Sequence, residues 1–469
     1  MASIRLQKQK DVDMTTGNII GHIIRFSIPL LLGNLFQQLY NTVDTWVVGN
    51  YVSNEAFSAV GAVAPIVNML IGSFMGLSSG AGVVISQYYG AGRKDKVEES
   101  VHTAITMTLI LTVFFTALGL LVTPLMLSFM NLHGNAVGEA KTYLTIYFGG
   151  MIGLMLYNMG AGILRAVGDS KRPFYFLVVC AVLNTVLDLL FVLVFKMGVD
   201  GVAWATVLSQ CISAILVVIT LLRSHDCVKL RIPKLRIHWP ILKKILLVGI
   251  PAALQMAVTA FSNVFVQSYI THFDVGMPSP DYMSGWTAYL KIDQLLFLPM
   301  QSISLAVTTF VGQNLGKGLV KRARQGVTRA VIISMTATAI MMIPVLIFAP
   351  NIVGFLNNKP EVVEHGTLFL HWLTPFYLLC CFNQIYASAL RGAGNSKASM
   401  YIMLSSFVLF RQAYLFVMAR VCNEVVPIAL SYPAGWLLCS LLTGIKKAIV
   451  IDFSVIILQI VIVCIADRI

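Results

Sequence analysis

The chain has 469 residues, of which 57% are hydrophobic and 11% are charged. A soluble domain carries about 25% charged residues, so this composition excludes a soluble globular protein of this length. The formal net charge of +13 would fit a nucleic-acid partner. However, the basic residues lie in the connections between apolar segments, a distribution typical of membrane proteins, and we expect no nucleic-acid partner.

Apolar runs of about 18 residues or more recur along the chain, and each is long enough to cross roughly 30 Å of hydrocarbon. The first run begins with His22 and Arg25 and has no small-residue cleavage signal, so it predicts a first span and not a removed signal peptide. Together the runs predict an all-α integral membrane protein with twelve transmembrane helices, near residues 22–50, 56–88, 100–127, 139–165, 173–195, 201–222, 245–272, 282–312, 326–349, 363–390, 398–420 and 426–444.

Lys and Arg are concentrated in alternate connections between these runs. The N-terminal segment, the connection after the second run and the segment 223–244 are rich in them, whereas the intervening connections hold few. Basic connections stay on the cytoplasmic side of a membrane. The pattern therefore predicts a multi-pass protein of the plasma (cytoplasmic) membrane with its N-terminus in the cytoplasm.

The two halves of the chain repeat each other. Pro251 follows Pro29 by 222 residues, and Asn263 follows Asn41 by the same offset. Further on the offset is 226: Gln-Tyr-Tyr-Gly-Ala-Gly at 87–92 matches Gln-Asn-Leu-Gly-Lys-Gly at 313–318, and Leu-Arg-Ala-Val-Gly-Asp-Ser-Lys at 164–171 matches Leu-Arg-Gly-Ala-Gly-Asn-Ser-Lys at 390–397. Six spans per half give both halves the same orientation, and such parallel repeats hold a substrate site near their interface.

This repeat predicts two lobes. We assign residues 1–222 to an N-lobe, 223–244 to a basic cytoplasmic linker, 245–445 to a C-lobe and 446–469 to an atypical hydrophobic tail. The tail is long enough for a thirteenth span, but a segment lying on the membrane surface and a tail altered by a reading-frame change are alternatives. We favour a membrane-associated segment.

Two acids, Asp44 and Asp188, lie inside apolar runs. A carboxylate at bilayer depth costs several kcal/mol, so it usually marks an ion pathway or a partner charge. Asn184 precedes Asp188 by four residues and shares its helix face. At a rise of about 1.5 Å per residue, both acids and Thr206 fall in the outer half of the membrane.

Two carboxylates with amide and hydroxyl oxygens suit either a proton or a hard cation such as Na⁺. Close like charges raise the proton affinity of one carboxylate, which favours proton exchange. The alternative is that Asp44 lies at the outer interface and that Asp188 caps or hydrogen-bonds a neighbouring helix.

The repeated motifs, with Gln-Gln-Leu-Tyr-Asn-Thr-Val-Asp at 37–44, resemble the multidrug and toxic compound extrusion (MATE) family over about residues 15–445. The resemblance implies twelve helices in two six-helix lobes that form a V. It also implies export of organic, often cationic or amphipathic compounds in exchange for H⁺ or Na⁺. The acid on the first helix resembles the DinF-like branch of the family.

In that branch an Asp on the first helix, an Asn and an Asp on the fifth and a Thr on the sixth form the cation site. The resemblance thus implies a cation-coupling site at Asp44, Asn184, Asp188 and Thr206. It further implies a substrate cavity in the N-lobe lined by Gln37, Tyr157 and Asn158. We add Asn41, a polar residue of the first apolar run, to these candidates.

The C-lobe departs from the branch of the family that carries acids on the seventh and tenth helices, since this chain has only amides there. Its polar candidates are Lys291, Asp293 and Arg411. Lys291 and Asp293 are either charges compensated within the lobe or groups that tune substrate charge or coupling. Arg411 either neutralises an acid such as Asp293 or contacts carbonyl groups.

We therefore expect a secondary active efflux antiporter for small molecules that works by alternating access, with helix 1 bending near Pro29. No phosphate-binding loop, nucleophile triad or Cys/His metal pattern is present, so we expect no enzyme activity, no cofactor, and no metal beyond Na⁺ at the cation site. We expect a monomer in the lipid bilayer without an obligate protein partner. Alternatives are a lipid or lipid-linked oligosaccharide flippase of the same superfamily, a channel, and an intramembrane aspartyl protease.

Overall fold

The computed structural model describes residues 13–52, 54–128, 136–224, 227–272, 281–422 and 424–450. Within these ranges the chain forms helices and no strand. Eleven helical segments of the described chain are long and apolar enough to cross a membrane, and a pair of helices bent by 48° makes a twelfth. The predicted all-α architecture with twelve spans is confirmed.

The first lobe holds the helices from the first half of the chain. They are α1 (Ile19–Tyr51), α2 (Asn54–Gly90), α3 (Lys94–Ser128), the bent pair α4 (Ala136–Gly149) and α5 (Met151–Ala166), α6 (Lys171–Leu189) with the π-helix η1 (Leu190–Val194), and α7 (Val199–Arg223).

The second lobe repeats this order. It contains α8 (Trp239–His272), α9 (Tyr282–Gly316), α10 (Val320–Ile347) with α11 (Ala349–Leu356), α12 (Pro360–Leu373) and α13 (Tyr377–Gly392) joined by η3 (Thr374–Phe376), α14 (Ser396–Leu404) and α15 (Arg411–Val421) joined by the π-helix η4 (Ser405–Phe410), and α16 (Val425–Ala429) with α17 (Ser431–Val450).

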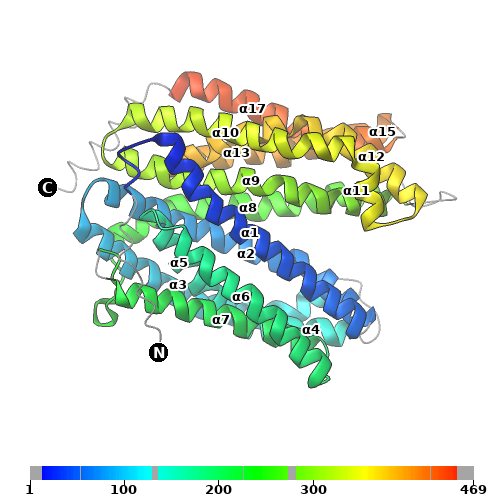
Figure 1. Ribbon diagram of the computed structural model, residues 1–469, viewed down its shortest axis with the longest axis horizontal. Helices are drawn as coiled ribbons and strands as arrows, with labels where there is room; N and C mark the ends of the chain where they lie inside the picture. Colours follow the sequence, from blue (N-terminus) through cyan, green and yellow to red (C-terminus); the bar gives the residue numbers. More distant parts are fainter. Residues whose placement is uncertain are drawn as a thin grey trace.

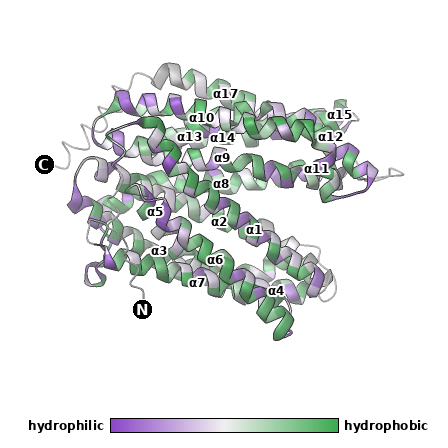
Figure 2. Cartoon of the chain, viewed as in Figure 1, coloured by the Kyte–Doolittle hydropathy of each residue, from purple (hydrophilic) through white to green (hydrophobic). Residues whose placement is uncertain are grey.

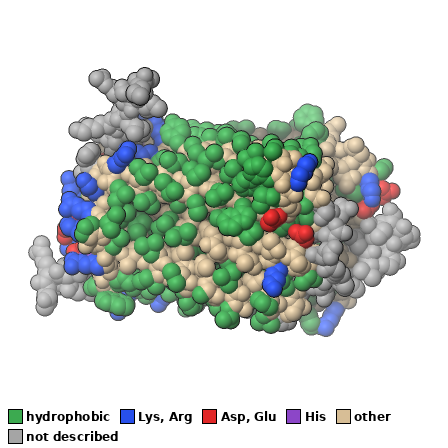
Figure 3. Space-filling view, turned by 90° about the horizontal axis from the view of Figure 1, so that it is seen from below, with side chains coloured by type: hydrophobic (Ala, Val, Ile, Leu, Met, Phe, Trp, Pro, Cys, Tyr) green, Lys and Arg blue, Asp and Glu red, His purple; other side chains and the backbone are tan. Residues whose placement is uncertain are grey.

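The lobes meet along α1, α2, α8 and α9, which lie between them in Figure 1. Lys and Arg gather mainly at one end of the molecule, which we call the basic end (Figure 3). Apolar residues run along the helices between the two ends, and hydrophilic residues are concentrated in the connections (Figure 2). Toward the end opposite the basic end the ribbons of the two lobes diverge, giving the V shape (Figure 1).

The repeated Leu-Arg-x-x-Gly motif ends a helix in both lobes. Gly168 and Gly394 have φ values of +92° and +84°, in the left-handed region that favours glycine. The following residues close the cap, since Asp169 N donates to Leu164 O at 3.0 Å and the corresponding bond of the second lobe is 2.9 Å long. This is the geometry of a helix C-terminus closed by glycine.

The segment between the lobes differs from the predicted linker of 223–244, because α8 already begins at Trp239. The described part contains a 3-10 helix, η2 (Ile232–Lys234), and packs on the basic end of α3. Lys234 Nζ lies 2.9 Å from Glu98 Oε1, and His238 N donates to Thr103 Oγ1 at 3.2 Å.

At the C-terminus, α17 continues to Val450, so the first residues of the predicted hydrophobic tail extend the last helix. The remainder of that tail, residues 451–469, lies outside the described residues.

Candidate ion and substrate sites

The four predicted cation-coupling residues come together from three packed helices of the first lobe. Asp44 belongs to α1, Asn184 and Asp188 to α6, and Thr206 to α7. Asn184 and Asp188 have no exposed surface, and Thr206 is buried. Immediately after Leu189 the helix widens into the π-helix η1, a departure from α geometry that often marks functional sites.

Most oxygens of this cluster lack a hydrogen-bond donor. In the described chain no donor reaches Asp44 Oδ1, Asn184 Oδ1 or either carboxyl oxygen of Asp188. The Asn184 amide donates to Thr206 Oγ1 at 3.5 Å, and that hydroxyl donates to the Val202 carbonyl at 3.0 Å. Thr206 therefore orients Asn184, and the free amide oxygen remains available as an acceptor.

The carboxyl groups of Asp44 and Asp188 lie close enough for a proton on one to hydrogen-bond the other. Buried polar oxygens are normally satisfied, and buried charges are paired, because an unpaired one is costly. Four acceptor oxygens without donors form an arrangement that a proton or a hard cation would complete. The residues present thus fit the coupling ion that the sequence analysis predicts.

Two tyrosines beside this cluster were not predicted. Tyr143 of α4 lies within electrostatic range of both carboxyl groups. One turn along, the hydroxyl of Tyr147 is buried and lies near the Gln210 side chain. The two rings stack with their centroids 6.1 Å apart. Their spacing of four residues in an apolar run places them on one helix face and was the available signal.

Three of the four predicted substrate residues line one cavity of about 80 Å³ in the first lobe. They are Gln37, Tyr157 and Asn158, and Pro29 contributes to the same wall. The fourth candidate, Asn41, is exposed and does not line this cavity. Tyr157 donates to the Pro173 carbonyl at 3.1 Å, which fixes its ring in the wall.

The cavity and the acidic cluster are neighbours. Tyr40 and Cys180 line the cavity, and each lies four residues, or one helical turn, before a residue of the cluster, Asp44 and Asn184 respectively. Arg165 also lines the cavity, although the sequence analysis assigned it only to a repeated motif. An ion bound at the cluster would therefore lie about one turn from a molecule in the cavity.

Helix α1 is continuous through Pro29, which is buried inside it. Ile19, Ile23 and Phe26 pack with Phe310 and other residues of α9 and α10 in the second lobe. Beyond Pro29, α1 packs on α6 in the first lobe, where Gly33 faces the Leu177 side chain. The helix that carries Asp44 thus contacts both lobes.

In the second lobe, Asp293 has two hydrogen-bond donors. Both Tyr377 and Tyr289 donate to its Oδ1, and the two hydroxyl groups are 3.1 Å apart. Lys291, two residues away on α9, is exposed. Within the described chain no ion pair joins either Lys291 or Arg411 to Asp293, so the suggested neutralisation of Asp293 by Arg411 is not formed.

Arg411 instead contacts uncharged groups. Its Nη1 donates to Asn263 Oδ1 at 2.7 Å, and its guanidinium lies 4.3 Å from the centroid of the Tyr432 ring. Cation–π contact and a hydrogen bond to an amide stabilise a buried guanidinium without an acid. Asn263 and Tyr432, both in the second lobe, therefore stabilise the Arg411 guanidinium.

At the basic end the repeated motifs of the two halves bind each other. Gln87 Nε2 donates to the Gly392 carbonyl at 3.0 Å, and Gln313 Nε2 donates to the Ala166 carbonyl at 2.9 Å. These pairs correspond under the offset of 226 residues, so each half uses its Gln-x-x-Gly motif to bind the Leu-Arg-x-x-Gly turn of the other. We call these two bonds the reciprocal latch.

The glycines of the motif make this contact possible. A Cβ on Gly90 would overlap the Gln313 carbonyl oxygen, and a Cβ on Gly316 would overlap the Gln87 carbonyl oxygen. The same packing extends along the lobe boundary, where Gly76 faces the backbone of Ala253. Small residues at such contacts let helix backbones approach closely.

Among the described residues, the N-terminal segment binds the Gln313 half of the latch and not the Gln87 half. Gln313 is fully buried, and its Oε1 accepts a bond from Met14 N at 3.1 Å. Lys317 Nζ donates to Thr15 Oγ1 at 2.8 Å, and Arg322 Nη2 donates to the Thr16 carbonyl at 2.7 Å. Residues 13–16, which we call the strap, thus fasten the start of α1 to the second lobe.

The reciprocal latch closes the basic end of the lobe boundary. Along α1 and α9 the contact continues to Gln38 Nε2, which donates to Gln294 Oε1 at 2.5 Å. The interlobe hydrogen bonds named here thus run from the basic end as far as Gln38 and Gln294. The structure is therefore closed at the basic end and splayed at the other.

A helical bundle built from a parallel repeat, with a cavity and an acidic cluster inside one lobe, defines a membrane transporter. The MatE family model matches residues 29–190 and 251–416, one match in each half. The chain is 31% identical over 405 residues to the "Probable multidrug resistance protein YpnP" of Bacillus subtilis, covering 86% of this chain and 89% of that protein. The chain belongs to the MATE family of multidrug efflux transporters, and it is not an enzyme.

Two further proteins are similar to this chain. A "FAD transporter" of Shewanella oneidensis is 23% identical over 404 residues, covering 82% of this chain and 85% of that protein. A solved structure described as the "Outward-facing conformation of a multidrug resistance MATE family transporter of the MOP superfamily" has a TM-score of 0.89 at 23% identity, covering 95% of this chain and 99% of that chain. The structural likeness establishes the two-lobe fold.

Proposed function

We propose that this chain exports small organic compounds, cationic or amphipathic ones among them, in exchange for H⁺ or Na⁺ by alternating access across the plasma membrane. The observation that carries the proposal is the group of four acceptor oxygens without donors on Asp44, Asn184 and Asp188. An energetically costly arrangement of this kind is retained where an ion binds and leaves. We further propose two lobes, residues 1–222 and a second lobe that begins with α8 at Trp239, and function as a monomer with a cytoplasmic N-terminus.

The ion supplies the positive charge that the two carboxylates lack. The Asp44 and Asp188 carboxylates hold it, the Asn184 carbonyl oxygen adds a ligand, and Thr206 keeps that amide oriented. Because Tyr40 and Cys180 connect the cluster to the cavity within one helical turn, ion binding changes the wall that a substrate contacts. Coupling requires the ion to bind one conformation more tightly than the other.

The second conformation must open the basic end. For this to happen the bonds from Gln87 to Gly392 and from Gln313 to Ala166 must break together, since both cross the same lobe boundary. Helix α1 is suited to link the two events, because Asp44 lies in its first-lobe part and the strap fastens its start to the second lobe. Pro29, which lacks an N–H donor, is the position where α1 bends most easily.

Efflux of a fluorescent organic cation from proteoliposomes tests the proposal. With an imposed gradient of the coupling ion, either protons or Na⁺, the wild type should export the compound. In Asp44→Asn the gradient-dependent efflux rate should be roughly 10- to 100-fold lower. Asp293→Asn serves as the matched control, because it also removes a buried carboxylate. Gradient-driven efflux at the wild-type rate by well-folded Asp44→Asn would refute the role of the cluster.

A further inference from the structure

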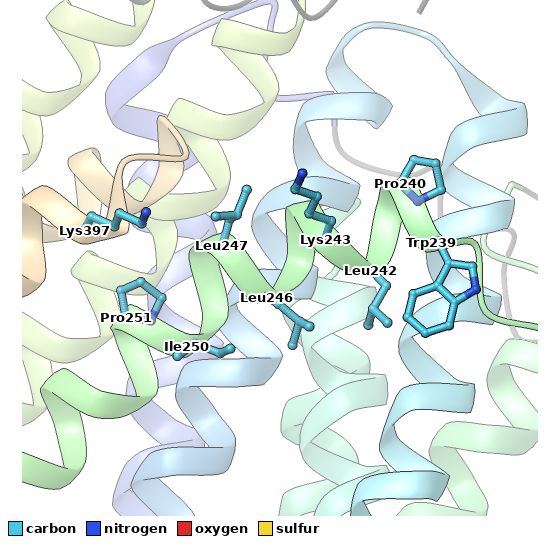
Figure 4. Close-up of a pocket in the computed structure, with 9 residues that line it drawn as sticks. All are labelled: Trp239, Pro240, Leu242, Lys243, Leu246, Leu247, Ile250, Pro251 and Lys397. Carbon is cyan, nitrogen blue, oxygen red and sulfur yellow. The ribbon is translucent and has the colours of Figure 1, made fainter.

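The first half of α8 forms one wall of a groove of about 800 Å³ near the basic end (Figure 4). Apart from two lysines its lining is apolar: Trp239, Pro240, Leu242, Leu246, Leu247, Ile250 and Pro251. The lysines are Lys243 on α8 and Lys397 in the first turn of α14. This groove lies on the flank of α8 and is separate from the cavity of the first lobe.

Part of the apolar lining of the groove faces outward from α8, whereas Leu242 and Pro251 are buried. Leu247, Ile250 and Leu254 are 47%, 52% and 47% exposed, and their spacing places them on one face of α8. The opposite face is buried, because Ile241 and Ile245 pack on α2 and α3. An exposed apolar stripe on a membrane-spanning helix faces lipid.

Both lysines are exposed, and neither has an acid or a hydrogen-bond acceptor as a partner among the described residues. Figure 4 shows Leu247 between them, so the two ammonium groups flank an apolar surface. Trp239, at the start of the span, is 74% exposed. Tryptophan is enriched at the interface of membrane and water, and Lys near a span binds anionic headgroups.

We propose that this groove binds an anionic phospholipid of the leaflet at the basic end. The phosphate lies between Lys243 and Lys397, and the acyl chains cover Leu246, Leu247 and Ile250. The headgroup charge complements the two unpaired ammonium groups, which a zwitterionic lipid satisfies less well. Basic pockets between transmembrane helices on the cytoplasmic side have this chemistry.

The groove lies between helices that contact different lobes. One wall, the start of α8, is packed on helices of the first lobe, and the other is the start of α14 in the second lobe. A bound lipid therefore contacts α8, which packs on the first lobe, and α14, which belongs to the second lobe.

The test is lipid retention by the full chain in nanodiscs of equal phosphatidylcholine and phosphatidylglycerol, followed by native mass spectrometry of lipids released with the protein. The wild type should retain phosphatidylglycerol preferentially. Lys243→Gln/Lys397→Gln should lower this preference roughly 30-fold, at about fivefold for each lysine near an anionic surface. Lys243→Arg/Lys397→Arg should keep it.

The matched control is Lys94→Gln/Lys321→Gln, which removes two exposed lysines from the basic end outside the groove. The proposal requires this control to retain the wild-type preference. Unchanged preference in Lys243→Gln/Lys397→Gln, or an equal loss in the control, would overturn it, because attraction to the basic end as a whole would then explain the retention. A thermal unfolding midpoint within a few degrees of the wild type confirms that each variant is folded.

Discussion

The two lobes treat buried charge in opposite ways. In the first lobe, Asp188 lies one turn after Asn184, and no donor of the described chain reaches either of its carboxyl oxygens. In the second lobe, Asp293 accepts from two tyrosines. Arg411 has an amide acceptor and an aromatic face, although its Nε has no acceptor in the described chain. A satisfied buried group stabilises one structure, whereas an unsatisfied one favours whatever ion completes it. The contrast supports the proposal that the first lobe binds the coupling ion and the second lobe gives structural support.

The same contrast extends to the π-helices, which occur in the equivalent span of each lobe. Asp188 lies just before η1, and Arg411 lies just after η4. Thus both lobes have a π-helix in this span, but the neighbouring charged residue is an acid in the first lobe and an arginine in the second. Under the proposed function, the two repeated lobes differ in role: the first binds the ion and the second supports the structure.

The largest expected difference is between variants in which the buried Asp of one lobe or of the other is replaced by Asn. Asp188→Asn should lower gradient-driven efflux roughly 10- to 100-fold, because it removes a charge that holds the ion. Asp293→Asn should leave the rate within about twofold, since an amide oxygen can still accept from the tyrosines. Initial rates in proteoliposomes measure both. Equal losses in the two variants would contradict the division between lobes.

The reciprocal latch provides a second comparison. Gln313→Ala removes two bonds of a fully buried side chain, and Gln87→Ala removes one. At about 1 kcal/mol for each bond, the form open at the basic end should gain about 30-fold in the first variant and about fivefold in the second.

Double electron–electron resonance between spin labels at Lys94 and Lys321, in a background without native cysteines, measures that population. The two positions are exposed and lie at the basic ends of different lobes. A larger opening in Gln87→Ala than in Gln313→Ala would show that the strap does not add to the closure.

The smallest effect is expected for Tyr377→Phe, which removes one donor from Asp293 while Tyr289 remains. The variant should lose about 1 kcal/mol of stability, which lowers the thermal unfolding midpoint by a few degrees at most, and should keep its ion coupling. The ratio of efflux with and without the gradient provides the check. A changed ratio would give the second lobe a part in coupling.

Sequence patterns predicted most of the fold. Apolar runs, alternate basic connections and the two offsets predicted twelve spans and the parallel repeat, because hydrocarbon thickness and helix rise leave few alternatives. The bend between α4 and α5 and the early start of α8 at Trp239 were not predicted, since both depend on packing against neighbouring helices.

The site was predictable only in part. Acids inside apolar runs indicated Asp44 and Asp188, because their desolvation is costly wherever the helices pack. Apolarity could not reveal that Tyr377 donates to Asp293 or that Arg411 pairs with Asn263, because these contacts join distant spans. Nor could spacing reveal that the two repeated motifs bind each other across the lobe boundary, where Gln313 meets the Ala166 carbonyl. By contrast, Tyr289 lies four residues before Asp293 on the same helix, so its spacing was an available signal.

The most direct test of the central claim is the thermal stability of the purified full chain as a function of the candidate ion. A ligand that binds only the folded state raises the unfolding midpoint by mass action. The midpoint of the wild type should rise with Na⁺ at constant ionic strength, or with falling pH if protons bind. This rise should be absent from Asp44→Asn/Asp188→Asn and present in Asp293→Asn. An equal rise in the double variant would contradict the assignment of the coupling ion to the Asp44 and Asp188 cluster.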